Sequence, residues 1–168
     1  MQNGRIAVSL VAALLFAATS PAFAADSTER QSVGSAGQQA DGYSVLSSVS
    51  GDGALVVFNS AAHNLVAKDL NRWSSDILLR DRVGRTTSLV SVSTAGAKAD
   101  GRNGVALISR DGKRVAFESA ATNLADGDTN GAVDVFVRDL GTGTTSRASL
   151  GPLGRQADQG NSLAALLG

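Results

Sequence analysis

The sequence predicts an all-β protein in which a four-stranded antiparallel unit is repeated. The first observation is an internal repeat, because Phe58–Leu65 is echoed by Phe117–Leu124, 59 residues later. The second is an Asp-Gly pair in each copy, at Asp52-Gly53 and Asp111-Gly112, which is a strong hairpin signal between strand-forming residues. The third is that β-branched runs alternate with Gly and Asp turns. A fixed period of this length is typical of stacked or radially arranged units.

The repeat extends on both sides of these segments and divides the chain into units. Ala40-Asp41-Gly42 matches Ala99-Asp100-Gly101, and after one inserted residue the offset becomes 58, so that Asp76–Asp81 matches Asp134–Asp139. A third copy begins at Gly154-x-x-Ala157-Asp158. We expect a signal peptide at 1–24, a flexible polar segment at 25–39, the first repeat at 40–92, the second at 93–150, and an incomplete third repeat and tail at 151–168.

Each unit reads as four short strands joined by hairpins. In the second unit Val115 and Phe117 alternate with Arg114 and Ala116, as in a strand with one buried face. A four-stranded antiparallel unit of this kind is one blade of a β-propeller, so the expected fold is about two propeller blades and the start of a third. The expected strands are 45–50, 54–60, 77–81 and 86–92 in the first unit, and 105–109, 113–119, 133–140 and 144–149 in the second.

The first residues predict an export signal. Arg5 gives a positive start, residues 6–18 form a short and mainly apolar run, and Ala22-Phe23-Ala24 is a small-x-small cleavage site. The alternative is an uncleaved membrane anchor, but a spanning helix needs about 20 apolar residues. We therefore expect cleavage after Ala24, a periplasmic or secreted product, and no membrane span in the mature chain.

The charge and the absence of cysteine exclude several classes of site. Without Arg5 the chain carries 14 basic and 15 acidic residues, which argues against a basic surface for nucleic acid. There is no cysteine, so disulfides, thiolate chemistry and Cys-based zinc sites are excluded.

Two segments of the second unit resemble the TolB-type β-propeller repeat. Ser109–Phe117 (SRDGKRVAF) is similar to the S-x-D-G-x-x-I/V-A-F core of that repeat, and Asp134–Leu140 (DVFVRDL) is similar to its D-I/V-F/Y-V-x-D-L strand. The resemblance covers roughly Asp41 to Ser149 and is weaker in the first unit. It implies an exported, non-catalytic propeller that serves as a protein-interaction module of the cell envelope, as in the periplasmic members of the family.

The number of units raises the question of how a ring would close. Complete propellers of this class usually carry about six to eight blades, within a general range of four to eight. Two units and part of a third cannot form a ring alone, and unpaired blade edges invite association. The expectation is that the chain self-associates, binds a protein partner, or is a truncated fragment of a longer propeller.

One loop has the spacing of a cation site. Residues 126–134 read D-x-D-x-N-G-x-x-D, and oxygens at alternate positions of a tight loop can converge on calcium. The ligands would be the side chains of Asp126, Asp128, Asn130 and Asp134 and the carbonyl of Ala132. The alternative is a turn shaped by local side-chain-to-backbone hydrogen bonds, since the first unit keeps only Asp69, Asn71 and Asp76. A calcium-binding adhesion or structural module is therefore a second functional hypothesis.

No catalytic constellation is predicted. His63 is the only histidine, its counterpart in the second unit is Thr122, and no G-x-S-x-G motif is present. The propeller part of a hydrolase is accordingly a third and weaker hypothesis, and we expect no catalytic residues.

Overall fold

The computed structural model describes residues 28–67, 74–157 and 160. The expected signal peptide and its cleavage site, together with Asp69, Asn71 and Asp158, lie outside the described residues. In the described part no helix is long and apolar enough to cross a membrane.

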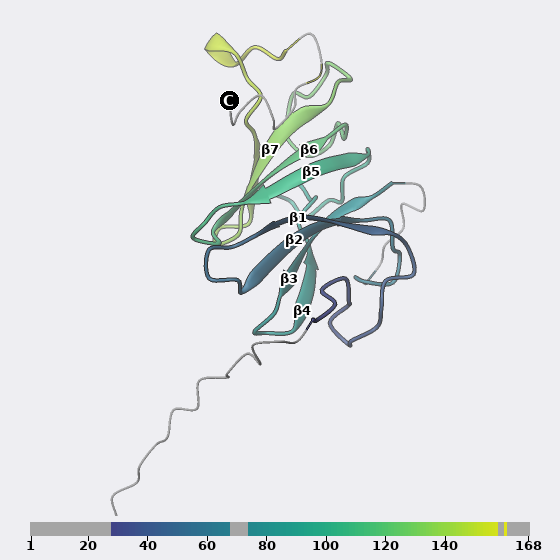
Figure 1. The fold of residues 1–168 in the computed structure, drawn as a ribbon. Coiled ribbons are helices and arrows are strands. Elements are labelled where there is room, and N and C mark those ends of the chain that lie inside the picture. Colours follow the sequence, from purple (N-terminus) through teal and green to yellow (C-terminus); the bar gives the residue numbers. More distant parts are fainter. Residues whose placement is uncertain (1–27, 68–73, 158–159, 161–168) are drawn as a thin grey trace, which may run out of the picture.

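The structure is two four-stranded antiparallel sheets, each formed by consecutive strands, so the all-β prediction is confirmed (Figure 1). The strands of the first sheet pair in the order β1-β2-β3-β4 and those of the second in the order β5-β6-β7-β8. A short 3₁₀ turn, η1 (Pro152–Gly154), follows the second sheet. The strands are β1 (Ser44–Val49), β2 (Leu55–Ser60), β3 (Asp76–Asp81), β4 (Thr86–Leu89), β5 (Asn103–Ile108), β6 (Arg114–Ser119), β7 (Asp134–Asp139) and β8 (Thr144–Arg147).

The repeated S-x-D-G motif closes the first hairpin of each sheet. In the second sheet Ser109 Oγ donates to Asp111 Oδ1 at 2.6 Å, and Asp111 Oδ1 also accepts the N–H of Lys113 at 3.1 Å. Gly112 has φ +70°, a left-handed conformation that favours glycine over residues with a Cβ atom. The first sheet repeats this pattern with Ser50, Asp52 and Gly53.

In each unit the A-D-G motif, which precedes the first strand of the sheet, is hydrogen-bonded to the A-A-x-N-L motif, which follows the second strand. In the second unit the N–H of Asp100 donates to Asn123 Oδ1 at 3.1 Å, and the N–H of Thr122 donates to Asp100 Oδ1 at 2.8 Å. His63 makes the matching contact in the first unit, where its N–H donates to Asp41 Oδ1 at 2.8 Å. His63 therefore occupies the same structural position as Thr122 in the second unit.

The segment before each sheet forms a small hairpin that docks on the sheet. Val33 pairs with Gln39 and Val92 pairs with Lys98 in isolated bridges. Thr87 in β4 donates its hydroxyl to the carbonyl of Val33 at 2.6 Å. We expected 25–39 to be flexible because it is polar. In the structure, residues 33–39 form this hairpin and are hydrogen-bonded to β4.

The two sheets pack face to face. We call the face of the first sheet that is turned toward the second sheet its trailing face, and the face of the second sheet that is turned toward the first its leading face. The trailing face of the first sheet carries Val57 and Ile77, and the leading face of the second sheet carries Val115 and Phe117. All four side chains are completely buried in one apolar cluster that joins the two sheets. Phe117 also stacks on Phe136, with ring centroids 5.8 Å apart. By the same convention, the leading face of either sheet carries the residues equivalent to Val115 and Phe117, and the trailing face carries those equivalent to Val57 and Ile77.

Candidate functional site

The loop expected to hold a metal connects β6 to β7, and three of its predicted ligands lie together. The side chains of Asp128 and Asp134 are 2% and 0% exposed, and Asn130 Nδ2 donates to Asp134 Oδ2 at 3.1 Å. Asp126 is exposed, and the N–H of Ala132 donates to Asn130 Oδ1 at 3.1 Å. The loop thus combines clustered carboxylates with a turn closed by its own side chain.

Arg147, the last residue of β8, brings a positive charge to these carboxylates. Its Nη1 atom lies 3.1 Å from Asp128 Oδ1 and 3.4 Å from Asp134 Oδ2, and its Nη2 atom donates to the carbonyl of Gly127 at 3.0 Å. Burial raises the pKa of the Asp128 carboxyl, Arg147 partly offsets this rise, and Asp134 and Asp100 add to it. Within the described ranges no three acidic or histidine side chains converge as metal ligands would.

The start of the third repeat is bound to the same loop. Gln156 Oε1 accepts the N–H groups of Thr129 and Asn130, both at 3.1 Å, and Gln156 Nε2 donates to the carbonyl of Gly127. Asn130 Nδ2 also donates to the carbonyl of Ala157 at 3.1 Å. Hydrogen bonds within the chain therefore account for the shape of this loop.

In the first sheet the equivalent aspartate obtains its cation from another position. Asp76 Oδ2 lies 2.8 Å from Lys98 Nζ, and Asp76 is 2% exposed. Leu89 stands where the second repeat has Arg147, and Gln156 in the third repeat stands where the second repeat has Lys98. Each buried aspartate therefore lies beside a basic side chain, which β8 supplies for Asp134 and the connection before β5 supplies for Asp76.

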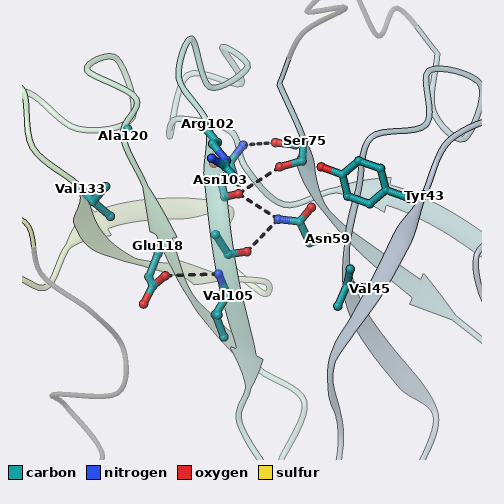
Figure 2. A pocket seen from close by; sticks show the side chains of 11 residues that line it. Tyr43, Val45, Asn59, Ser75, Arg102, Asn103, Val105, Glu118, Ala120 and Val133 are labelled. Carbon is teal, nitrogen blue, oxygen red and sulfur yellow. Dashed lines mark hydrogen bonds between the residues drawn. The ribbon is translucent and has the colours of Figure 1, made fainter.

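A groove opens at the start of β5, between the two sheets (Figure 2). Its volume is about 490 Å³. Four of its side chains are apolar or aromatic and exposed, with exposed fractions of 64% for Tyr43, 57% for Val45, 52% for Val105 and 38% for Val133. The other lining residues are Asn59, Ser75, Arg102, Asn103, Gly104, Glu118 and Ala120. Such a concave, mainly apolar surface with a few polar groups is typical of a binding site.

Hydrogen bonds between the sheets fix the floor of the groove (Figure 2). Asn59 Nδ2 donates to the carbonyls of Asn103 and Gly104 at 2.9 and 2.8 Å. Asn103 Nδ2 donates to the carbonyl of Ser75 at 2.8 Å, and Ser75 Oγ donates back to the Asn103 carbonyl at 3.0 Å. These contacts hold β5 in place, so the groove is preformed.

The groove collects positions at which the two repeats differ. Tyr43, Val45, Asn59 and Ser75 correspond to Arg102, Gly104, Glu118 and Val133, and all eight line it. The sequence predictions missed this site because they relied on residues that the repeats share. The differences between aligned repeats are the signal that would have identified it.

No protein-family model and no curated protein matches this chain. Among solved structures it is similar to a TolB structure from Agrobacterium tumefaciens (18% identity, TM-score 0.42, 65% of this chain and 32% of the other). It is also similar to TolB from Acinetobacter baumannii (17%, 0.41, 68% and 23%) and to the β-propeller domain of the trilobed protease from Pyrococcus furiosus (17%, 0.40, 63% and 27%). Two of these neighbours are TolB proteins and the third is a β-propeller domain, and the chain spans about a quarter to a third of their lengths.

Proposed function

We propose that this chain is an exported, non-catalytic protein-interaction module of the β-propeller type and that the groove at β5 receives its partner. The observation that supports this proposal most directly is the gathering of Tyr43, Val45, Val105 and Val133 around one preformed hollow. Aromatic and apolar anchors of this kind dominate the energy of protein interfaces, while a polar rim contributes specificity.

The polar groups of the groove fit recognition better than chemistry. In the described part of the chain its ionisable side chains are Tyr43, Arg102 and Glu118. Glu118 Oε2 already accepts the N–H of Val105 at 3.4 Å. A nucleophile with a neighbouring base, which an acyl- or phosphoryl-transfer site requires, is not among the groove residues. The proposed role is therefore binding, with Arg102 available to an acidic or carbonyl group of the partner.

A substitution in the groove tests this proposal. Val105→Glu places a charge among the apolar side chains, and we expect the tagged protein to retain at least tenfold less partner from an envelope extract. Val83→Glu is the matched control, because Val83 is 72% exposed in the turn between β3 and β4, outside the groove. Equal retention by both variants, with unchanged melting temperatures, would refute the groove as the binding site.

Export is proposed from the sequence of residues 1–24 and has its own test. N-terminal sequencing of the protein from its native host should give Ala25 as the first residue, since cleavage is expected after Ala24. A product that begins at Met1 and stays in the cytoplasm would contradict export without affecting the groove.

A further inference from the structure

A second hollow lies beside β8, at the opposite edge of the second sheet from the groove at β5. Its volume is about 770 Å³, and we call it the β8 pocket. It opens between the hairpin that precedes the sheet, the loop that follows β6, and β8 itself. Its lining includes Ser93, Ala97, Asn123, Ala125, Asp126 and Arg147. A hollow of this size is large enough to hold a ligand.

In the first unit, one bridging amide and two apolar side chains stand at the equivalent positions. Gln38 extends from the hairpin to the loop, where its Nε2 atom donates to the carbonyl of Asn64 at 2.8 Å. Val66 and Leu89 pack against the apolar cluster of the first sheet, which includes the buried Leu65. The hairpin, the loop and the fourth strand of the first unit are therefore joined by side chains of the protein itself.

The second unit has replaced all three of these side chains, and the replacements line the β8 pocket. The counterparts are Ala97 for Gln38, Ala125 for Val66 and Arg147 for Leu89. Two of them are alanines, and the guanidinium of Arg147 is bound to Asp128 and to the carbonyl of Gly127. Because folded chains are otherwise closely packed, the loss of side-chain volume at positions around one point accounts for the hollow.

The polar groups of the pocket suit a neutral amide better than an anion. Asn123 lines the pocket, and its carbonyl is the counterpart of the Asn64 carbonyl that accepts the bridging amide in the first unit. Ser93 Oγ accepts the N–H of Ala97 at 3.1 Å, so its hydroxyl hydrogen can be donated to a ligand oxygen. The exposed carboxyl group of Asp126 also lines the pocket and would repel a ligand carboxylate when both are ionised.

We propose that the β8 pocket binds a glutamine side chain from an extended segment of a partner protein, in the role that Gln38 has in the first unit. The ligand amide donates to the Asn123 carbonyl, and its oxygen accepts from the Ser93 hydroxyl. Its methylene groups lie against Ala97 and Ala125. One side chain fills only part of about 770 Å³, so the pocket also has room for the polypeptide on either side of it. The proposal does not depend on the groove at β5.

Titration of the nitrogen-15-labelled full chain with capped tripeptides tests the proposal by NMR. Gly-Gln-Gly should give saturable shifts of the N–H signals of Ala97, Asn123 and Ala125. It should bind at least about tenfold more tightly than Gly-Glu-Gly, because an ionised carboxylate cannot donate to the Asn123 carbonyl. Free glutamine, which lacks the flanking peptide, should bind more weakly than Gly-Gln-Gly. No saturable shift with Gly-Gln-Gly, or equal binding of Gly-Glu-Gly or of free glutamine, would overturn the proposal.

A variant that copies the first unit identifies the pocket. Ser93→Gly/Ala97→Gln should fill the pocket with a side chain of the protein itself and weaken the binding of Gly-Gln-Gly at least about tenfold. The change at Ser93 is needed because a Cβ atom at the equivalent Gly34 would overlap the Gln38 amide. Circular dichroism and thermal melting establish that the variant is folded. Undiminished binding by the folded variant would overturn the proposal.

Two single variants complete the test. Ala148→Gln adds the same side chain at an exposed position outside the pocket and should bind the peptide as the wild type does. Ala125→Val copies Val66, narrows the pocket without adding a polar group, and should also weaken binding. It decides the outcome if the double variant does not fold, because undiminished binding by Ala125→Val together with a loss in Ala148→Gln would place the peptide elsewhere and overturn the proposal.

Discussion

The Nη1 atom of Arg147 lies 3.1 Å from Oδ1 of Asp128, inside the loop whose spacing suggested a calcium site. Both side chains are almost completely buried, at 6% and 2% exposed. A guanidinium in this position neutralises the carboxylates and donates hydrogen bonds, as a bound cation would neutralise and coordinate them. The loop therefore has a cation of its own.

Calcium should consequently have little effect on the wild-type protein. We expect millimolar calcium to leave the melting temperature of the wild type unchanged and to give no heat in calorimetric titration. Arg147→Leu, which introduces the residue found at the equivalent Leu89, should lower the free energy of unfolding by about 3–5 kcal/mol, because it leaves buried carboxylates without their cation. A rise in melting temperature of the wild type with calcium would instead support the calcium-binding hypothesis.

The exchange of basic partners between the two units gives a second prediction. Lys98→Gln, which copies Gln156, should cost about 3 kcal/mol by leaving Asp76 without its ion pair. Adding Leu89→Arg, which copies Arg147, should recover part of this loss. Urea denaturation of the wild type, both single variants and the double variant measures the coupling, which we expect to be at least about 1 kcal/mol in favour of the double variant. Additive effects would show that Arg at position 89 does not reach Asp76.

The fold was largely predictable because the repeat fixes which residues are equivalent, and each shared motif closes a turn or a connection by local contacts. The fourth strand of the first sheet is shorter than predicted, however, and ends at Leu89 instead of continuing to residue 92. Val92 leaves the strand because it pairs with Lys98 in the hairpin before the second sheet. The pattern of β-branched residues could not distinguish a ladder from an isolated bridge.

The candidate sites were less predictable because they depend on contacts between distant residues. Of the residues that the spacing singled out, Asn130 donates to Asp134, and Asp128 and Asp134 both lie beside Arg147. Arg147 was missed because it follows Asp134 across a hairpin, and Leu89 at the equivalent position gave no hint of a charge there. The groove was missed for the opposite reason, since its residues are those that the repeat does not share.

A glycine in the repeated A-D-G motif tests the close approach of two segments. An added Cβ at Gly101 would lie 2.5 Å from the backbone of Ala120, so Gly101→Ala should cost about 1–3 kcal/mol. Gly141→Ala is the control, because its Cβ would meet only the Asp139 side chain, at 3.5 Å, and should change stability by less than about 0.5 kcal/mol. Chemical denaturation compares the two variants. Equal and small effects would mean that the connection relaxes without strain.

The first hairpin of the second sheet makes stability depend on pH. Hydrogen bonds from the Ser109 hydroxyl and the N–H of Lys113 lower the pKa of Asp111 below its ordinary value of 3.8. The unfolded chain therefore binds this proton more tightly, so the stabilisation is present above pH 3.8 and is lost as the pH falls through the lowered pKa of the folded state. Asp111→Asn should thus lower the urea midpoint clearly at pH 6 and much less near pH 2.5, and Ser109→Ala should reproduce part of that pH dependence. A midpoint difference between wild type and Asp111→Asn that is the same at both pH values would contradict the assignment.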